Sequence, residues 1–300
     1  MASVSIIDVS PRDGLQNDAR LIATKQKLKL VEQLVAAGVS KVEVTSFVRP
    51  DRVPQMADAD EVLSAAVQIP KLEGIALVPN LKGYDRAKIY KPDEITWVSA
   101  ASELFNQNNI GLSIEENLVQ FNKVTTQAKA DGISTCFAIA VSFGCPYEGD
   151  VPEERVVEIV GKAIEAGADR IGIADTIGIA TPLQVERLMP KVLEIAQEIP
   201  VAIHLHDTRG LGLANAYSAY KAGIRIFETA VSGIGGCPFA PGAAGNLATE
   251  DLVYLFEQMD IDTGIHFEKI LDVADYAASL STNNPLGRIR HVEKREGIIK

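Results

Sequence analysis

Two histidines separated by one residue are the clearest candidates for chemistry in this chain. His204 and His206 end an apolar run that begins at Val201. Alternate side chains of a strand share a face, so both imidazoles are expected to point the same way. Two imidazoles on one rigid face form half of a divalent-metal site, and the alternative is a pair of hydrogen-bonded core histidines. The chain has four histidines, and the use of two of them here favours the metal.

Candidates for the other half of such a site follow other strand-like runs. Asp13 comes after the run 4–9, and Asn246 lies in a glycine-rich loop after the run 226–231. The alternative for Asp13 is a cap on a turn before Gly14. Cys237 lies in the same glycine-rich loop as Asn246. A lone cysteine in a mobile loop over a polar site is a candidate acid, base or nucleophile, and the alternative is an incidental thiol.

The elements that must position these residues repeat along the chain. Eight strand-like runs are short, rich in Val and Ile, and apolar on both faces, as buried parallel strands are. They cover residues 4–9, 41–47, 74–78, 94–99, 135–142, 170–175, 201–206 and 226–231. Amphipathic helical stretches alternate with them, and a glycine follows three of the helices as a left-handed stop: Gly38, Gly167 and Gly223.

Eight such units in one chain predict an α/β fold, a single (β/α)8 TIM barrel. We expect the barrel over about residues 4–248, with extra helices and a tail over 249–300. A doubly wound sheet is the alternative, but no Gly-x-Gly-x-x-Gly follows the first run. The tail from Ser281 onward is polar, and we expect it to be mobile or to cover part of the barrel mouth.

Catalytic groups of a TIM barrel come from the carboxyl ends of its strands and the loops after them. Arg12, Glu43 with Thr45 on its face, and Asp175 all fall there. An inward carboxylate needs a partner, and Arg12 is the candidate partner for Glu43. The alternatives are a surface charge for Arg12 and a cap on the helix near Thr181 for Asp175.

Composition narrows the class of partner. The net charge of −11 argues against nucleic acid and against an anionic membrane surface. Three cysteines in 300 residues fit a reducing cytoplasm and not a disulfide framework. The first residues lack the pattern of a signal peptide, and no apolar run reaches transmembrane length. We therefore expect a cytoplasmic globular protein.

Together these motifs resemble the 3-hydroxy-3-methylglutaryl-CoA lyases, metal-dependent TIM-barrel enzymes marked by an Asp-Arg-Glu constellation. The matching stretches are residues 10–17, 45–48, 53–56, 79–83, 100–105, 144–149, 175–178 and 204–208. The most specific is 233–238, running on to 245–254. The resemblance covers about residues 4–280, in the family's order of motifs.

The resemblance implies a role for each candidate residue. Four ligands would hold Mg²⁺ or Mn²⁺: Asp13, His204, His206 and Asn246. Arg12 would stabilise charge on the carbonyl or enolate, and Glu43 would order the site around it. Asp175 would help to move the proton of a tertiary hydroxyl, and Cys237 would serve as an acid or base on a closing loop. The substrate would be an acyl-CoA, as in leucine degradation, and we expect a homo-oligomer, a dimer or a tetramer.

Departures from the family pattern bear on the acyl group. Members of the family usually carry Arg and Tyr where this chain has Cys136 and Ala138. We expect both small side chains to face inward and to enlarge a pocket that also uses Gln16 and Thr45. Arg209 replaces a Tyr and adds a cation near the mouth.

The chemistry expected is cleavage of 3-hydroxy-3-methylglutaryl-CoA, or a close 3-hydroxyacyl-CoA, to acetyl-CoA and a keto acid. The same mechanism on citramalyl-CoA or an isoprenoid-extended glutaryl-CoA is one alternative. A condensing enzyme working in the reverse direction is a weaker one, because such relatives usually carry further domains. A barrel that binds a CoA thioester without turnover is the alternative from another class.

Overall fold

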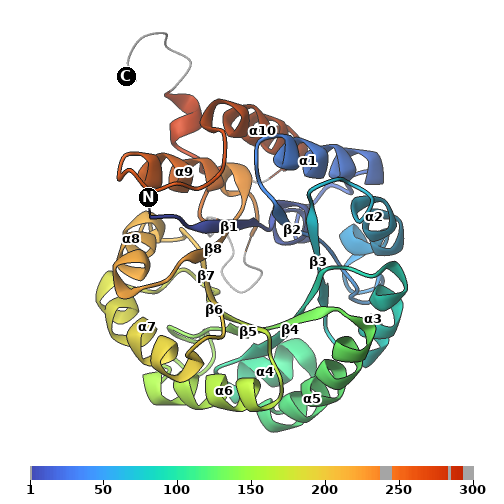
Figure 1. Ribbon diagram of the computed structural model, residues 1–300, viewed down its shortest axis with the longest axis vertical. Helices are drawn as coiled ribbons and strands as arrows, with labels where there is room; N and C mark the ends of the chain where they lie inside the picture. The colour runs from blue at the N-terminus through green and yellow to red at the C-terminus, as the bar shows by residue number, and fades with distance from the viewer. Residues whose placement is uncertain (1, 237–244, 283–284, 293–300) are drawn as a thin grey trace.

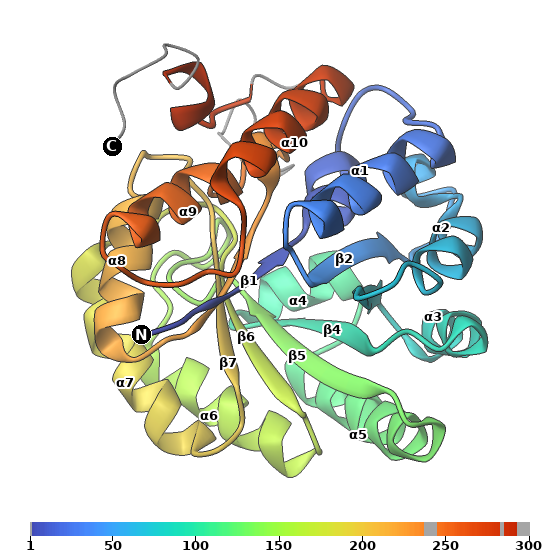
Figure 2. The same cartoon turned by 45° about the horizontal axis from the view of Figure 1, so that its top comes forward.

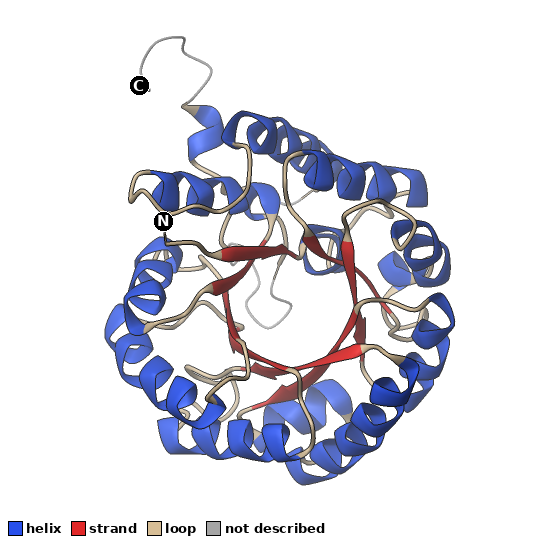
Figure 3. Ribbon diagram, in the orientation of Figure 1, coloured by secondary structure: helices blue, strands red, loops and turns tan. Residues whose placement is uncertain are grey.

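Eight parallel strands close into a barrel in chain order in the computed structural model, which describes residues 2–236, 245–282 and 285–292 (Figures 1 and 3). The predicted TIM-barrel fold is confirmed. The strands are β1 Ser5–Asp8, β2 Lys41–Ser46, β3 Glu73–Val78, β4 Glu94–Ala100, β5 Ser134–Ala140, β6 Arg170–Asp175, β7 Val201–Leu205 and β8 Ile226–Thr229.

Helices form a ring around the strands (Figure 3). They are α1 Thr24–Ala36, α2 Ala59–Ala66, α3 Leu81–Ala87, α4 Glu103–Ile110, α5 Ile114–Asp131, α6 Glu153–Glu165, α7 Pro182–Ala196, α8 Gly212–Ala222, α9 Thr249–Glu257 and α10 Phe267–Leu280. The last two helices fill the ring between α8 and α1, so the segment after β8 completes the cover of the barrel (Figures 1 and 2). No helix in the described ranges is long and apolar enough to cross a membrane.

Strand alternation decides which side chains face the barrel interior. On β6, Ile171 and Ile173 pack in the hydrophobic core, while Gly172 and Ala174 line a central cavity. On β7, His204 and the following His206 line the same cavity. The expectation that both histidines share one inward face is therefore confirmed.

The C-terminal tail binds loops at the carboxyl end of the barrel. The backbone N–H groups of Leu286 and Gly287 donate to the carbonyl of Ser232, at 3.0 and 3.1 Å. The guanidinium of Arg288 lies 2.9 Å from the carboxylate of Asp207. No tail residue in the described part lines the central cavity. These residues therefore brace the loops after β7 and β8 from outside.

Candidate active site

A cavity of about 360 Å³ opens at the carboxyl ends of the strands. One side of it is polar and is lined by Arg12, Asp13, Gln16, His204, His206 and Glu228. The other side is lined by small and apolar side chains of β4, β5 and β6. A TIM barrel places its chemistry at this end.

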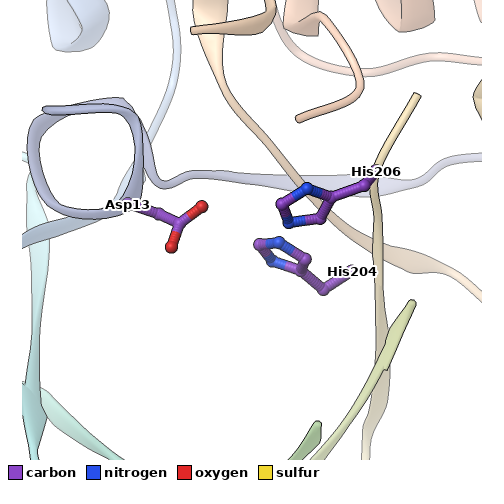
Figure 4. Close-up of side chains that lie close together, drawn as sticks. All are labelled: Asp13, His204 and His206. Atoms are coloured by element: carbon purple, nitrogen blue, oxygen red, sulfur yellow. The ribbon is translucent and has the colours of Figure 1, made fainter. Parts of the chain in front are cut away.

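Asp13 and the two histidines meet at the polar side. The imidazole centroids of His204 and His206 are 5.2 Å apart, and Asp13 faces them from the other side of the opening (Figure 4). One ligand atom from each of the three residues lies within 4.8 Å of the others. Both histidines are less than a tenth exposed. The arrangement brings a carboxylate and two imidazoles around one point, as a divalent cation requires.

Asp13 owes its position to one π-helical turn, Ser10–Gly14, that follows β1 directly. The carbonyl of Val9 accepts the N–H groups of Asp13 at 2.8 Å and Gly14 at 3.2 Å. A Cβ on Gly14 would lie 2.7 Å from a side-chain carbon of Ile234, so the turn packs closely on the loop after β8. Single π turns of this kind often place side chains at functional sites.

Asn246 supplies a fourth candidate ligand. Its amide N–H₂ donates to Asp13 Oδ2 at 2.8 Å and to the carbonyl of Ile234 at 3.0 Å. Its Oδ1 is buried and accepts no hydrogen bond from the described chain. An unsatisfied buried acceptor costs about 1–3 kcal/mol, and a cation at Oδ1 would remove that cost. Carboxylate, amide oxygen and two imidazoles are a donor set that suits Mg²⁺ or Mn²⁺.

The charges around the ligands favour their deprotonated forms. Burial alone would raise the pKa of Asp13, but the charges of Arg12 and the two histidines outweigh it and hold that pKa well below its usual range. Burial and the neighbouring charge of His204 lower the pKa of His206 to about 4. Near pH 7, Asp13 is therefore a carboxylate and His206 is a neutral imidazole. Both are the forms that bind metals.

Glu228 of β8 orients His204 from behind. The Nδ1 of His204 lies 3.1 Å from Glu228 Oε2. Burial raises the pKa of Glu228, but the hydrogen bond to His204 and the charge of Arg170 lower it to about 2. An ionised carboxylate only accepts hydrogen bonds, so Nδ1 carries the proton and Nε2 is left free for a ligand.

Arg170 and Glu94 extend this chain of charges to the other side of the barrel. Arg170 Nη1 donates to Glu228 Oε1 at 2.8 Å, and Nη2 donates to Glu94 Oε1 at 2.5 Å. The sequence prediction missed this network. Glu228 and Arg170 sit on inward positions of short apolar strands, and the argument applied to Glu43, that an inward charge needs a partner, would have found them.

Arg12 pairs with Glu43 as expected, and it also contacts Asp13. Its Nε donates to Glu43 Oε2, and its Nη1 donates to Asp13 Oδ1 at 2.5 Å. Burial raises the pKa of Glu43 in spite of the charge of Arg12. The guanidinium lines the cavity next to the ligand set, where it can stabilise negative charge on a substrate oxygen.

Asp175 and Thr45 do not line the cavity. Asp175 lies on the same face of β6 as Ile173. Its carboxylate oxygens accept the N–H groups of Ile179 at 2.8 Å and Ala180 at 3.1 Å. Burial raises its pKa to about 6. The pairing of β2 with β3 shifts register between Glu43 and Thr45, so the expected shared face is lost. The Thr45 hydroxyl contacts the sulfur of Met56 at 3.8 Å.

Of the remaining predicted residues, some line the cavity and others do not. Gln16 and Ala138 line the cavity, whereas Cys136 is buried beside Arg170 and Arg209 is exposed. Arg209 Nη1 donates to the carbonyls of Ile177 and Gly178 and so braces the loop after β6. Cys237 lies outside the described residues.

Comparisons with known proteins agree with this geometry. The HMGL-like family model matches residues 3–276. The chain belongs to the HMGL-like family. The mitochondrial hydroxymethylglutaryl-CoA lyase of Bos taurus is 42% identical over 276 residues, 91% of this chain and 84% of that protein. The (R)-citramalyl-CoA lyase of Chloroflexus aurantiacus is 40% identical over 289 residues, 93% and 91% of the two chains.

A solved HMG-CoA lyase from Acinetobacter baumannii, in complex with coenzyme A and 3-methylmalate, superposes with a TM-score of 0.93. It is 34% identical, and the match covers 99% of this chain and 97% of that one. The family predicted from the motifs is confirmed, and this HMGL-like protein is a carbon–carbon lyase.

The variant His206→Ala is expected to lose bound metal, because it removes one of the two imidazoles from the ligand set. Elemental analysis after dialysis against Mn²⁺ measures the loss. The control is His266→Ala, at an exposed position before α10. Full metal content in His206→Ala would contradict the ligand assignment.

The variant Glu228→Gln is expected to weaken Mn²⁺ binding about 10–100-fold, the usual cost of losing the carboxylate behind a histidine ligand. Glu94→Gln is the matched control, because it removes the same charge from Arg170 without touching His204. Calorimetric titration measures both. Equal losses in the two variants would show that net charge, and not the contact with His204, controls affinity.

Proposed function

We propose that this lyase uses Mg²⁺ or Mn²⁺ to cleave 3-hydroxy-3-methylglutaryl-CoA, or a close 3-hydroxyacyl-CoA, to acetyl-CoA and a keto acid such as acetoacetate. The observation that carries the proposal is the convergence of Asp13, His204 and His206 with the unpaired Oδ1 of Asn246, beside Arg12. The names of the relatives supply the class of substrate.

The reaction breaks the bond between C2 and C3 of the acyl chain. The C3 hydroxyl loses its proton, C3–O becomes a carbonyl, and the electron pair of the broken bond stays on C2 as a thioester enolate. The enolate then takes a proton at C2 to give acetyl-CoA. A bound divalent ion supplies polarisation of the substrate oxygens and lowers the pKa of the hydroxyl.

The residues of the chain divide the remaining work. Arg12 stabilises negative charge on the substrate oxygen, and Glu43 fixes the guanidinium from behind. Cys237 would donate the proton to the enolate, as the resemblance implies. For Asp175 the contacts favour a positioning role, because it holds the loop that carries the cavity-lining Thr176.

Citramalyl-CoA is a second candidate substrate, favoured by the relative from Chloroflexus aurantiacus. It lacks the one methylene that the glutaryl compound has between C3 and the carboxylate, so the same bond changes would give pyruvate.

We also propose a cytoplasmic homo-oligomer. The free thiols of Cys136 and Cys145 support the compartment, and light scattering tests the assembly.

Removal of the metal is expected to abolish cleavage. Release of acetyl-CoA from both candidate thioesters should stop in EDTA and return when Mg²⁺ or Mn²⁺ is added in excess. A barrel that binds CoA without turnover would show thioester binding and no release under any condition. Full activity after complete chelation would contradict the metal dependence.

The variant Cys237→Ala is expected to lower kcat by roughly 10²–10⁴-fold, the usual contribution of a general acid or base. KM should change much less, because the thiol moves a proton and does not anchor CoA. Cys145→Ala is the control, since that thiol is buried against Ser102. An unchanged kcat would remove Cys237 from the mechanism.

A further inference from the structure

Small side chains make one wall of the cavity. Val98 of β4, Ala138 of β5, and Gly172 and Ala174 of β6 line it, on the side of the barrel away from β1 (Figure 1). Ala138 and Gly172 are paired across the two strands, and a Cβ on Gly172 would lie 3.4 Å from that of Ala138. The cavity therefore extends to the backbone on this side because the side chains there are small.

The wall is open to the cavity and not filled by neighbours. Ala138 is partly exposed there, whereas Phe137 and Ile139, which flank it on the outward face of β5, have no exposed surface. Ala174 and Val98 are partly exposed in the same way. A substrate group can therefore reach this surface from the ligand set without displacing a core side chain.

In the part of the chain that the structure describes, no unpaired lysine or arginine lines this wall. Among the described residues that line the cavity, Arg12 is the single Lys or Arg, and it is held by Glu43 and Asp13. Arg170 lies below the wall, opposite Cys136 in the strand register. Its Nε and Nη2 donate to Glu94 and its Nη1 donates to Glu228. This guanidinium closes the floor and is committed to its partners.

The two described hydroxyls that line the cavity each already make a hydrogen bond. Thr176 Oγ1 accepts the N–H of Val141 at 2.8 Å, and the hydroxyl of Thr96 hydrogen-bonds Glu43. A carboxylate placed against Ala138 would therefore lose water without gaining a cation, which is unfavourable in a buried site. A hydrocarbon group placed there loses no hydrogen bonds to water and buries apolar surface.

We infer that this wall, with Ala138 as its specificity-determining residue, binds an uncharged hydrocarbon substituent on C3 that is longer than methyl. The substrate carboxylate then lies on the polar side, with Arg12 and the ligand set. The inference rests on the proposed function and narrows its substrate class to 3-hydroxyacyl-CoA thioesters with a branched, extended C3.

A homologous series tests the inference. The C3 methyl of 3-hydroxy-3-methylglutaryl-CoA is replaced by ethyl and by n-butyl, so that cleavage gives acetyl-CoA and a longer 3-oxo acid in each case. The wild-type protein with Mn²⁺ is expected to cleave the butyl compound with a kcat/KM at least equal to that of the methyl compound.

Filling the wall should reverse this preference. Ala138→Leu is expected to lower the butyl-to-methyl ratio of kcat/KM on the order of 10²-fold, and Ala138→Val by less, because excess hydrocarbon in a filled pocket is rejected by steric clash. Ala130→Leu, on the exposed face of α5, is the matched control and should leave the ratio unchanged. Mn²⁺ titration of each variant checks that the ligand set is intact.

The outcomes separate the inference from the proposed function. Cleavage of the methyl compound alone, or an unchanged ratio in both Ala138 variants, overturns the inference and leaves the lyase proposal standing. Cleavage of neither citramalyl-CoA nor any member of the series, with either metal, overturns both.

Discussion

Unpaired charges are costly to bury, and the interior of this barrel buries acidic, basic and imidazole side chains side by side. The charges next to the two histidines are compensated by neighbours, several of which come from other strands. Arg12 is held by Glu43 and Asp13, and His204 is held by Glu228, which in turn is held by Arg170. The ligand set therefore depends on contacts that span the barrel from β1 and β2 through β8 to β6 and β4.

This compensation would let one cavity hold both the proposed cation and an anionic substrate. The carboxylate of Asp13 and the free imidazole nitrogens offer a cation its ligands, while Arg12 leaves positive charge beside them for a developing oxyanion. The Arg170 network adds rigidity below the site, and the small wall beside it leaves room for substrate. In the proposed function, polar chemistry and apolar recognition occupy different sides of one pocket.

The sequence predicted what strand periodicity controls. The barrel, the shared face of His204 and His206, and the inward position of Ala138 all follow from alternation in short apolar runs. It failed where a local irregularity changes direction, as at the register shift that turns Thr45 away from Glu43. It also failed where an interaction joins distant strands, because Arg170 and Glu228 become partners only once the barrel closes.

Two further differences have the same origin. Cys136 was expected to enlarge the pocket, but the neighbouring strand fills that space with Arg170, which no pattern within one strand reveals. Arg209 and Asp175 carry charge near the mouth, but both bind the loop after β6. The backbone groups of a loop compete with the cavity for nearby charged side chains. Sequence spacing does not show whether such a side chain binds the loop or faces the cavity.

The central claim is that Asp13, His204, His206 and Asn246 hold one divalent ion. Anomalous diffraction at the manganese edge, from crystals of the protein grown with Mn²⁺, measures the ion's position directly. The account predicts a single strong peak at bonding distance from the Asp13 carboxylate, Nε2 of His204, a ring nitrogen of His206 and Oδ1 of Asn246. A peak elsewhere, or an Oδ1 of Asn246 turned toward a protein donor in the metal-loaded crystal, would contradict it.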